Sequence, residues 1–190
     1  MSAPGQLENE IKIRLTDAGD GQRRLEAAGF SLRRERVFEV NILYDSPDGA
    51  LRKSDRVLRL RRVNGACLLT LKGPAERERH KSREELETET GNFEITEAIL
   101  CRMGYSPVFR YEKFRAEYGK DEEPGTVTLD ETPVGTFLEL EGEPMWVDST
   151  AGLLGFSTKD YIFSSYARIF LDCCAISGVT ATNMVFRIGK

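Results

Sequence analysis

The sequence is poor in histidine and cysteine. It contains one histidine, His80, and four cysteines, Cys67, Cys101, Cys173 and Cys174. A single histidine disfavours a serine or cysteine triad and a histidine-rich metal site. The cysteines show neither zinc-like pairing nor the regular spacing of a disulfide framework. We therefore expect free, buried thiols in a reducing compartment, and we expect His80, in a highly charged stretch, to lie in a solvated loop.

Long apolar runs and a one-sided charge are also missing. No stretch reaches the roughly 18 apolar residues of a transmembrane helix, and residues 1–5 have neither the basic nor the apolar region of a signal peptide. The formal net charge is only -4, whereas proteins that bind duplex nucleic acid usually carry a basic excess. The sequence thus predicts a cytoplasmic protein that binds neither a membrane nor a nucleic-acid duplex.

What the sequence does contain is alternation of polar and apolar residues, which is typical of strands with one apolar face. Eight strands are predicted, at residues 7–15, 37–44, 57–63, 67–72, 82–89, 111–118, 126–129 and 136–141. Helical spacing predicts helices at 21–28, 93–103 and 159–171, and Gly29 and Gly104 follow the first two. Asn64-Gly65 is typical of a tight hairpin turn. The fold class is therefore α+β, with an antiparallel meander or barrel.

The polar faces of these strands are charged. Arg59 and Arg61 share one face, and Glu139 and Glu141 share another, because side chains two apart in a strand point the same way. For any single strand, a charged face that meets solvent is a sufficient explanation. The recurrence of charged faces in strand after strand instead favours a shared interior toward which these faces point. Buried charges must pair or receive a charged ligand. Carboxylates suit Mg²⁺ and basic side chains suit phosphate, so the pattern indicates phosphoryl or nucleotidyl transfer.

Residues 8–12, ENEIK, resemble the ExExK signature of the CYTH superfamily, the triphosphate tunnel metalloenzymes. The family includes CyaB-type class IV adenylyl cyclases, thiamine triphosphatases and inorganic triphosphatases. Segments 58–61, 69–74, 82–87, 111–115 and 135–141 resemble its further motifs in order, whereas Ser164 stands where many relatives carry lysine. The resemblance implies a closed or nearly closed eight-stranded antiparallel tunnel with helices packed outside. We take residues 1–175 as this domain and 176–190 as a tail or an added strand.

The resemblance also implies roles for the charged side chains. The implied ligands of Mg²⁺ or Mn²⁺ are Glu8, Glu10, Asp130, Glu139 and Glu141. The implied triphosphate-binding residues are Lys12, Arg59, Arg61, Lys72, Arg83, Lys113 and Arg115. Glu85 and Glu87 would complete the acidic lining and, with Lys12, are the candidate catalytic residues.

Several functions fit this lining. Hydrolysis of tripolyphosphate, thiamine triphosphate or a nucleoside triphosphate is favoured slightly, because no segment offers an evident adenine pocket. A class IV adenylyl cyclase, making cyclic AMP and pyrophosphate from ATP, would use the same residues. A non-catalytic polyphosphate- or nucleotide-binding module would need fewer carboxylates, and a purely structural barrel would leave lumen charges uncompensated. A homodimer is left open.

Overall fold

The computed structural model describes residues 6–77 and 81–187, so that His80 lies outside the described residues. The elements are β1 (Gln6–Leu15), α1 (Ala18–Ala27), β2 (Ser31–Asp45), α2 (Ala50–Lys53), β3 (Val57–Val63), β4 (Ala66–Lys72), β5 (Glu76–Arg77), β6 (Lys81–Thr90), α3 (Phe93–Arg102), β7 (Ser106–Gly119), β8 (Thr126–Thr132), β9 (Gly135–Glu141), α4 (Pro144–Leu153), a 3-10 turn (Thr158–Asp160), β10 (Tyr161–Ile162) and α5 (Tyr166–Ser177). Among the described residues, none of the helices has the length and apolar character needed to span a membrane.

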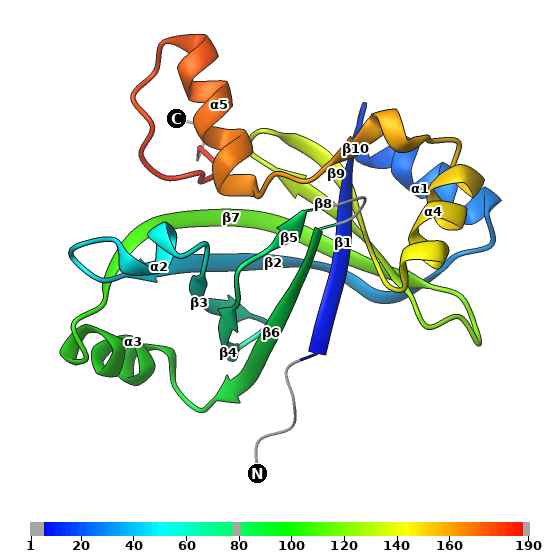
Figure 1. Cartoon of the computed structure of the whole chain (residues 1–190). Coiled ribbons are helices and arrows are strands. Elements are labelled where there is room, and N and C mark those ends of the chain that lie inside the picture. Colours follow the sequence, from blue (N-terminus) through cyan, green and yellow to red (C-terminus); the bar gives the residue numbers. More distant parts are fainter. Residues whose placement is uncertain (1–5, 78–80, 188–190) are drawn as a thin grey trace.

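Eight strands close into a barrel. The sheet runs β10-β1-β9-β8-β7-β2-β3-β4-β6-β5, and an additional pairing between β1 and β6 joins its two sides. At that seam Glu8 lies opposite Arg83. All the strand pairs are antiparallel, and the two-residue strands β5 and β10 extend the sheet beside β6 and β1. The predicted antiparallel eight-stranded barrel is confirmed (Figure 1).

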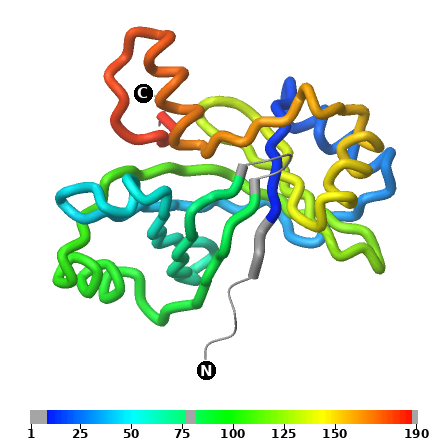
Figure 2. The backbone as a smooth tube through the Cα atoms, viewed as in Figure 1, coloured from blue at the N-terminus to red at the C-terminus, as the bar shows by residue number. Residues whose placement is uncertain are grey.

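Helices cover the apolar outer face of the barrel in two places, and α5 covers a third apolar cluster, which belongs to the inward faces of the strands. Beneath α1 and α4, the buried side chains Ile13, Leu138 and Leu140 form one cluster with helix residues such as Leu25 and Val147. A second cluster lies under α2 and α3, and a third under α5. Figures 1 and 2 show α1 and α4 side by side at one end of the molecule and α3 at the other. This packing buries the outer face and leaves the charged faces of the strands for the lumen.

The predicted turns and helix ends are largely confirmed. Asn64 and Gly65 both have positive φ, 48° and 81°, as a tight hairpin turn between antiparallel strands requires. Gly29 and Gly104, also at positive φ, follow the last turns of α1 and α3. The cysteines are free, as expected, and Cys67 and Cys174 are buried, but Cys173 is only half-buried and Cys101, on the outer side of α3, is exposed.

The helix predicted at 159–171 is wrong at both ends, since the observed helix begins later and continues to Ser177. Ser157 and Asp160 form a capping box that closes a 3-10 turn, and residues 161–162 then pair with β1. The helix begins only at Tyr166, where Ser165 Oγ accepts a hydrogen bond from Arg168 N at 3.3 Å. Helices α2 and α4 were not predicted: α2 has only one turn, and α4 has a weak separation of apolar and polar faces. Local hydrogen bonding and tertiary packing decide these segments.

Candidate active site

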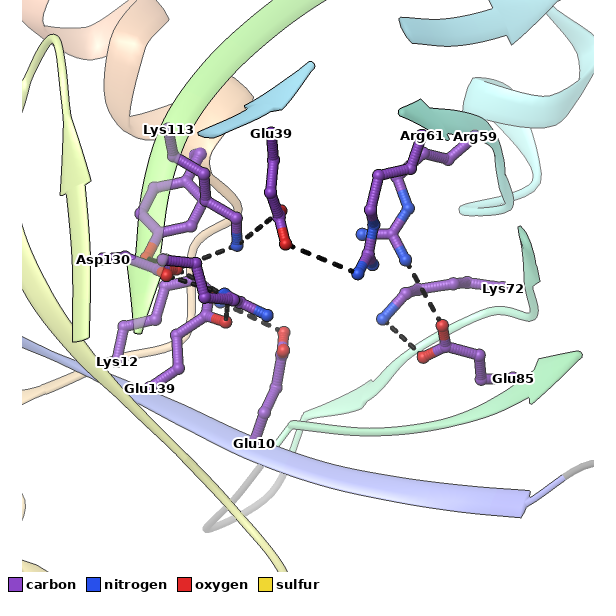
Figure 3. Close-up of polar contacts among 12 residues, drawn as sticks. Glu10, Lys12, Glu39, Arg59, Arg61, Lys72, Glu85, Lys113, Asp130 and Glu139 are labelled. Atoms are coloured by element: carbon purple, nitrogen blue, oxygen red, sulfur yellow. Dashed lines mark hydrogen bonds and ion pairs between the residues drawn. The ribbon is translucent and has the colours of Figure 1, made fainter. Parts of the chain in front are cut away.

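The barrel lumen gathers the charged faces of its strands. Alternation along β3 turns Arg59 and Arg61 inward, while Leu58 and Leu60 are buried on the outside. The same geometry brings residues of β1, β2, β6, β7, β8 and β9 into one region, where Figure 3 shows them converging. Every candidate site residue whose side chain the structure describes lies in this region or at its margin. For Glu8 only the backbone, in β1 opposite Arg83, is described.

Acidic side chains of β1 and β9 meet around Lys12. Its Nζ lies 3.2 Å from Glu10 Oε1 and 3.1 Å from Glu139 Oε1. Burial disfavours the lysine charge, but the two carboxylates outweigh it and raise the pKa of Lys12. Burial likewise opposes ionisation of Glu139, yet Lys12 and Arg115 hold its pKa well below the usual range. In this structure Lys12 thus compensates two of the predicted metal ligands.

Glu141 is the least compensated member of this acidic group. It lies opposite Glu10 in the pairing of β1 with β9 and lines the lumen cavity. Glu141 is exposed at the edge of the cavity, yet partial desolvation by the surrounding protein and then the carboxylates of Glu139 and Glu10 raise its pKa, against the lowering effect of Lys72. A position where carboxylates repel one another is one that a cation stabilises.

Asp130 occupies the centre of a buried cationic cluster. It is 0% exposed, and its carboxylate accepts hydrogen bonds from Lys113 Nζ at 2.9 Å, Arg115 Nε at 2.7 Å and the Tyr166 hydroxyl at 2.8 Å. Arg115 also contacts Glu139. Both oxygens of Asp130 are already engaged, which favours a role in anchoring the basic side chains. Its predicted role as a metal ligand stays a prediction.

A second ion-pair cluster lies on β3, β4 and β6. Lys72 Nζ lies 2.6 Å from Glu85 Oε2, and Arg59 Nη2 lies 3.2 Å from Glu87 Oε2 and 3.5 Å from Glu85 Oε1. Thr70, which is fully buried, adds a hydrogen bond from its hydroxyl to Glu87 at 2.6 Å. The candidate catalytic carboxylates Glu85 and Glu87 are therefore held beside the candidate phosphate-binding bases, as Figure 3 shows for Glu85.

Two of the predicted basic residues are more weakly paired. Arg61 reaches Glu39 only at 3.8 Å and Glu87 only at 3.7 Å. Burial lowers the pKa of Arg61, and the adjacent Arg59 lowers it further. Arg83 lies 3.6 Å from Asp55, and its Nε finds no hydrogen-bond partner within the described residues. These guanidinium groups retain hydrogen-bonding capacity for an anion.

Sequence reasoning missed Glu39, Asn41 and Tyr166. Glu39 lies between Lys113 Nζ and Arg61 Nη1, 3.8 Å from each (Figure 3). Asn41 is 0% exposed, and neither of its amide atoms has a hydrogen-bond partner among the described residues. The alternation of β2 gave a usable signal, since it places Glu39 and Asn41 on one face. Tyr166, in contrast, follows a turn that no periodicity marks.

A cavity of about 1690 Å³ opens onto these residues. Its charged lining includes Lys12, Arg59, Lys72, Arg83 and Glu139. Apolar side chains contribute as well, among them Ile99 and Met103 near α3. The charged residues line the lumen part of this cavity, whereas Leu58, Leu69 and Ile99 belong to a groove on the outer face of the sheet beside α3.

The carboxylates fit a hard divalent ion by their chemistry. Glu10, Glu139 and Glu141 offer oxygen ligands on adjacent strands. Lys12 pairs with Glu10 and Glu139, and among the side chains that the structure describes no salt bridge of this kind is recorded for Glu141. Within the described residues, no three acidic, histidine or cysteine groups lie close enough to chelate an ion by themselves. Mg²⁺ usually takes only one or two carboxylates and completes its shell with water and substrate phosphates. The donor set is compatible with that mode.

Comparisons with known proteins agree with this geometry. Residues 6–145 match the model of the CYTH domain family. MJ0240 of Methanocaldococcus jannaschii, named provisionally as an adenylate cyclase, is 30% identical over 135 residues, which cover 71% of this chain and 76% of that protein. The solved structure of PH1819 from Pyrococcus horikoshii has a TM-score of 0.71 at 28% identity, covering 87% of this chain and 99% of that one. A structure from Vibrio parahaemolyticus, named provisionally as an adenylate cyclase, has a TM-score of 0.74 at 23% identity, with coverage of 87% and 98%, and supports the fold alone.

Proposed function

Because the chain belongs to the CYTH domain family, we propose that it is a divalent-metal-dependent enzyme that hydrolyses a triphosphate within its barrel. The proposal rests on one observation: acidic side chains of β1 and β9 face the same lumen as basic side chains of β3, β4 and β7. Carboxylates for a metal ion beside guanidinium and ammonium groups for phosphates are the parts that phosphoryl transfer requires.

In the proposed site Glu10, Glu139 and Glu141 would hold Mg²⁺ or Mn²⁺. The ion would supply charge neutralisation at the phosphate oxygens and would make the phosphorus more electrophilic. The weak pairing of Arg61 and Arg83 supports their role in binding phosphate, because charge-assisted donors become fully used only when an anion is present.

Glu85 is the proposed group that orients and deprotonates the attacking water. Lys72 and Arg59 fix its carboxylate at 2.6 and 3.5 Å. Attack of the water oxygen on the terminal phosphorus would form one P–O bond and break the bridging P–O bond. The proton would go to Glu85, and the leaving oxygens would be stabilised by the surrounding bases. Tripolyphosphate would thus yield pyrophosphate and phosphate.

Adenylyl cyclase activity is the second candidate, and the similarity to MJ0240, which is named provisionally as an adenylate cyclase, favours it. In that reaction the ribose 3′-hydroxyl of ATP would attack the α-phosphorus and expel pyrophosphate. The two reactions differ in which phosphorus faces the nucleophile.

One experiment separates these functions. The purified protein is incubated with tripolyphosphate, thiamine triphosphate or ATP, each with Mg²⁺, Mn²⁺ or excess chelator, and phosphate, pyrophosphate and cyclic AMP are resolved by ion-exchange chromatography. Metal-dependent phosphate release supports hydrolysis, and cyclic AMP with equimolar pyrophosphate supports the cyclase. Binding without turnover of any of the three substrates would identify a binding module instead.

A further inference from the structure

The chain after α5 returns to the barrel wall. Met184 forms an isolated parallel bridge with Tyr111 of β7. Met184 N donates to Arg110 O at 3.0 Å, and Glu112 N donates to Met184 O at 2.9 Å. Figure 1 shows this red end of the chain passing back from α5 toward the barrel. Met184 therefore pairs with the N-terminal half of β7 through a single bridge, and the segment 183–186 lies along that edge.

The edge that this segment occupies is left open by the neighbouring strand. β2 pairs with β7 from Ser106 to Gly119, whereas β8 pairs with β7 only from Phe114 to Tyr118. The backbone groups of Arg110 and Glu112 that point away from β2 consequently need other partners. Met184 supplies them, and it thereby completes the barrel wall where β8 does not reach.

Side chains fix the segment in this place. Asn183 Oδ1 accepts a hydrogen bond from Arg110 N at 2.8 Å, and Phe186 N donates to Glu112 Oε2 at 3.1 Å. The Phe186 ring packs against Phe114 with centroids 5.3 Å apart. Met184 itself is 0% exposed and lies in one cluster with Tyr111, Phe137, Tyr166 and Ile169. The segment therefore packs directly against the apolar part of the Tyr111 side chain.

The other end of Tyr111 faces the proposed phosphate site. Tyr111 shares the inward face of β7 with Lys113, lines the cavity, and has its hydroxyl within hydrogen-bonding reach of the Arg59 guanidinium. Burial alone would raise the pKa of Tyr111, but Arg59, Lys113 and Arg61 outweigh it and lower that pKa. The hydroxyl thus lies where three basic side chains concentrate positive charge.

We propose that Tyr111 is a further substrate-binding residue, whose hydroxyl donates a hydrogen bond to the phosphate chain beside Arg59 and Lys113, and that Met184 is the positioning residue that holds it there. The inference rests on the proposed function. A phenol has one donor and two acceptor sites, so it can accept from Arg59 and donate to a phosphate oxygen at the same time. The structure assigns the C-terminal segment to the active site through this contact.

The test compares Tyr111→Phe with the wild type by calorimetric titration of tripolyphosphate and by steady-state hydrolysis. Phenylalanine keeps the ring that packs on Met184 and removes only the hydroxyl. Loss of a hydrogen bond to a charged group predicts that Kd and KM rise about tenfold, with the thermal melt nearly unchanged. Tyr105→Phe removes a hydroxyl from the outer-face cluster under α2 and α3, away from the lumen, and should leave Kd and KM unchanged.

Met184→Ala and Met184→Leu test the positioning role. The alanine variant should raise KM in the same direction as Tyr111→Phe, and leucine, which restores most of the packing volume, should return KM toward the wild-type value. A lower melting temperature with an unchanged KM in Met184→Ala would show that the segment only stabilises the fold. Wild-type Kd and KM in Tyr111→Phe would overturn the proposal, whereas absence of tripolyphosphate binding in the wild type would overturn the proposed function itself.

Discussion

Lys113 Nζ donates a hydrogen bond to Asp130 Oδ2 at 2.9 Å, and both side chains are almost completely buried, at 3% and 0% exposure. Forming an ion pair at this depth costs desolvation free energy. Removing one partner of the pair costs more, because it leaves an uncompensated buried charge. Asp130 in addition accepts from Arg115 and Tyr166. The carboxylate therefore holds two bases of the proposed phosphate site in their inward conformations.

Asp130→Asn should accordingly destabilise the protein. Asparagine has nearly the same shape but removes the charge that faces Lys113 and Arg115, and we expect a loss of about 3–5 kcal/mol in the free energy of unfolding. Glu131→Gln is the control, since Glu131 pairs with the half-exposed Arg36 and should cost less than about 1 kcal/mol. Urea unfolding at neutral pH measures both. Equal, small losses in the two variants would show that Asp130 does not anchor the bases.

The lumen residues could be predicted from sequence because strand alternation is a property of the backbone. Arg59, Lys72 and Glu139 were expected to face a common interior, and the structure places them there. The pairing among them could not be predicted. That Lys12 lies between Glu10 and Glu139 depends on the register of β1 with β9 and on closure of the barrel, neither of which leaves a local signal.

Segments outside the alternating strands were harder for a different reason. The predicted helix at 159–171 failed because Asp160 and Ser157 satisfy each other locally, which residue periodicity does not report. The docking of Met184 on β7 depends on where β8 stops pairing. Such contacts are fixed by tertiary geometry, which residue periodicity does not report.

Glu39 should contribute a pH-dependent part of the stability. Burial alone would raise its pKa, but Lys113, Arg115 and further bases lower it from 4.5 to about 2. A carboxylate whose pKa is lower in the folded state stabilises the fold above its unfolded pKa, and this contribution disappears as the pH falls from about 4.5 toward 2. The shift corresponds to about 3 kcal/mol.

Glu39→Gln should therefore be about 3 kcal/mol less stable than the wild type at pH 7, and the gap should narrow as the pH falls below about 4.5. Chemical unfolding of both proteins from pH 7 to pH 3 measures the gap. Glu117→Gln, which removes a partner of the exposed Arg34, serves as the control with a small gap throughout. A gap for Glu39→Gln that stays constant with pH would contradict the electrostatic explanation.

Arg61→Met should separate substrate binding from structural ion pairing. Arg61 is buried next to Arg59, and its contacts with carboxylates are long, at 3.7 and 3.8 Å. Removing its charge should leave the ligand-free melting temperature unchanged or higher, because repulsion and desolvation oppose that charge in the folded state. Tripolyphosphate binding should weaken about tenfold or more, since a charge-assisted donor is lost.

Thermal melts with and without saturating tripolyphosphate and Mg²⁺ test this expectation. The ligand-induced rise in melting temperature seen in the wild type should shrink in Arg61→Met. Arg34→Met removes an arginine from the exposed part of β2 and should keep the full rise. A large ligand-free loss with an undiminished rise would mean that Arg61 is a structural partner of Glu39 and Glu87.

Glu141→Gln tests the metal assignment most directly. Glu141 faces the cavity beside Glu10 and Glu139, and the mutual repulsion of these carboxylates is part of what raises its pKa. Removing one of these charges should leave the metal-free protein as stable as the wild type or more so, while the affinity for Mn²⁺ falls by at least about tenfold because an oxygen ligand is lost. Titration followed by the electron paramagnetic resonance of free Mn²⁺, with and without tripolyphosphate, reports binding independently of turnover.

Glu94→Gln serves as the control, because it changes a carboxylate on α3 whose side chain is 70% exposed. This variant should bind Mn²⁺ as the wild type does. If Glu141→Gln instead keeps wild-type Mn²⁺ affinity and unimpaired metal-dependent hydrolysis, the ion binds elsewhere in the lumen. Glu141 would then contribute only to the electrostatic potential at the entrance of the lumen.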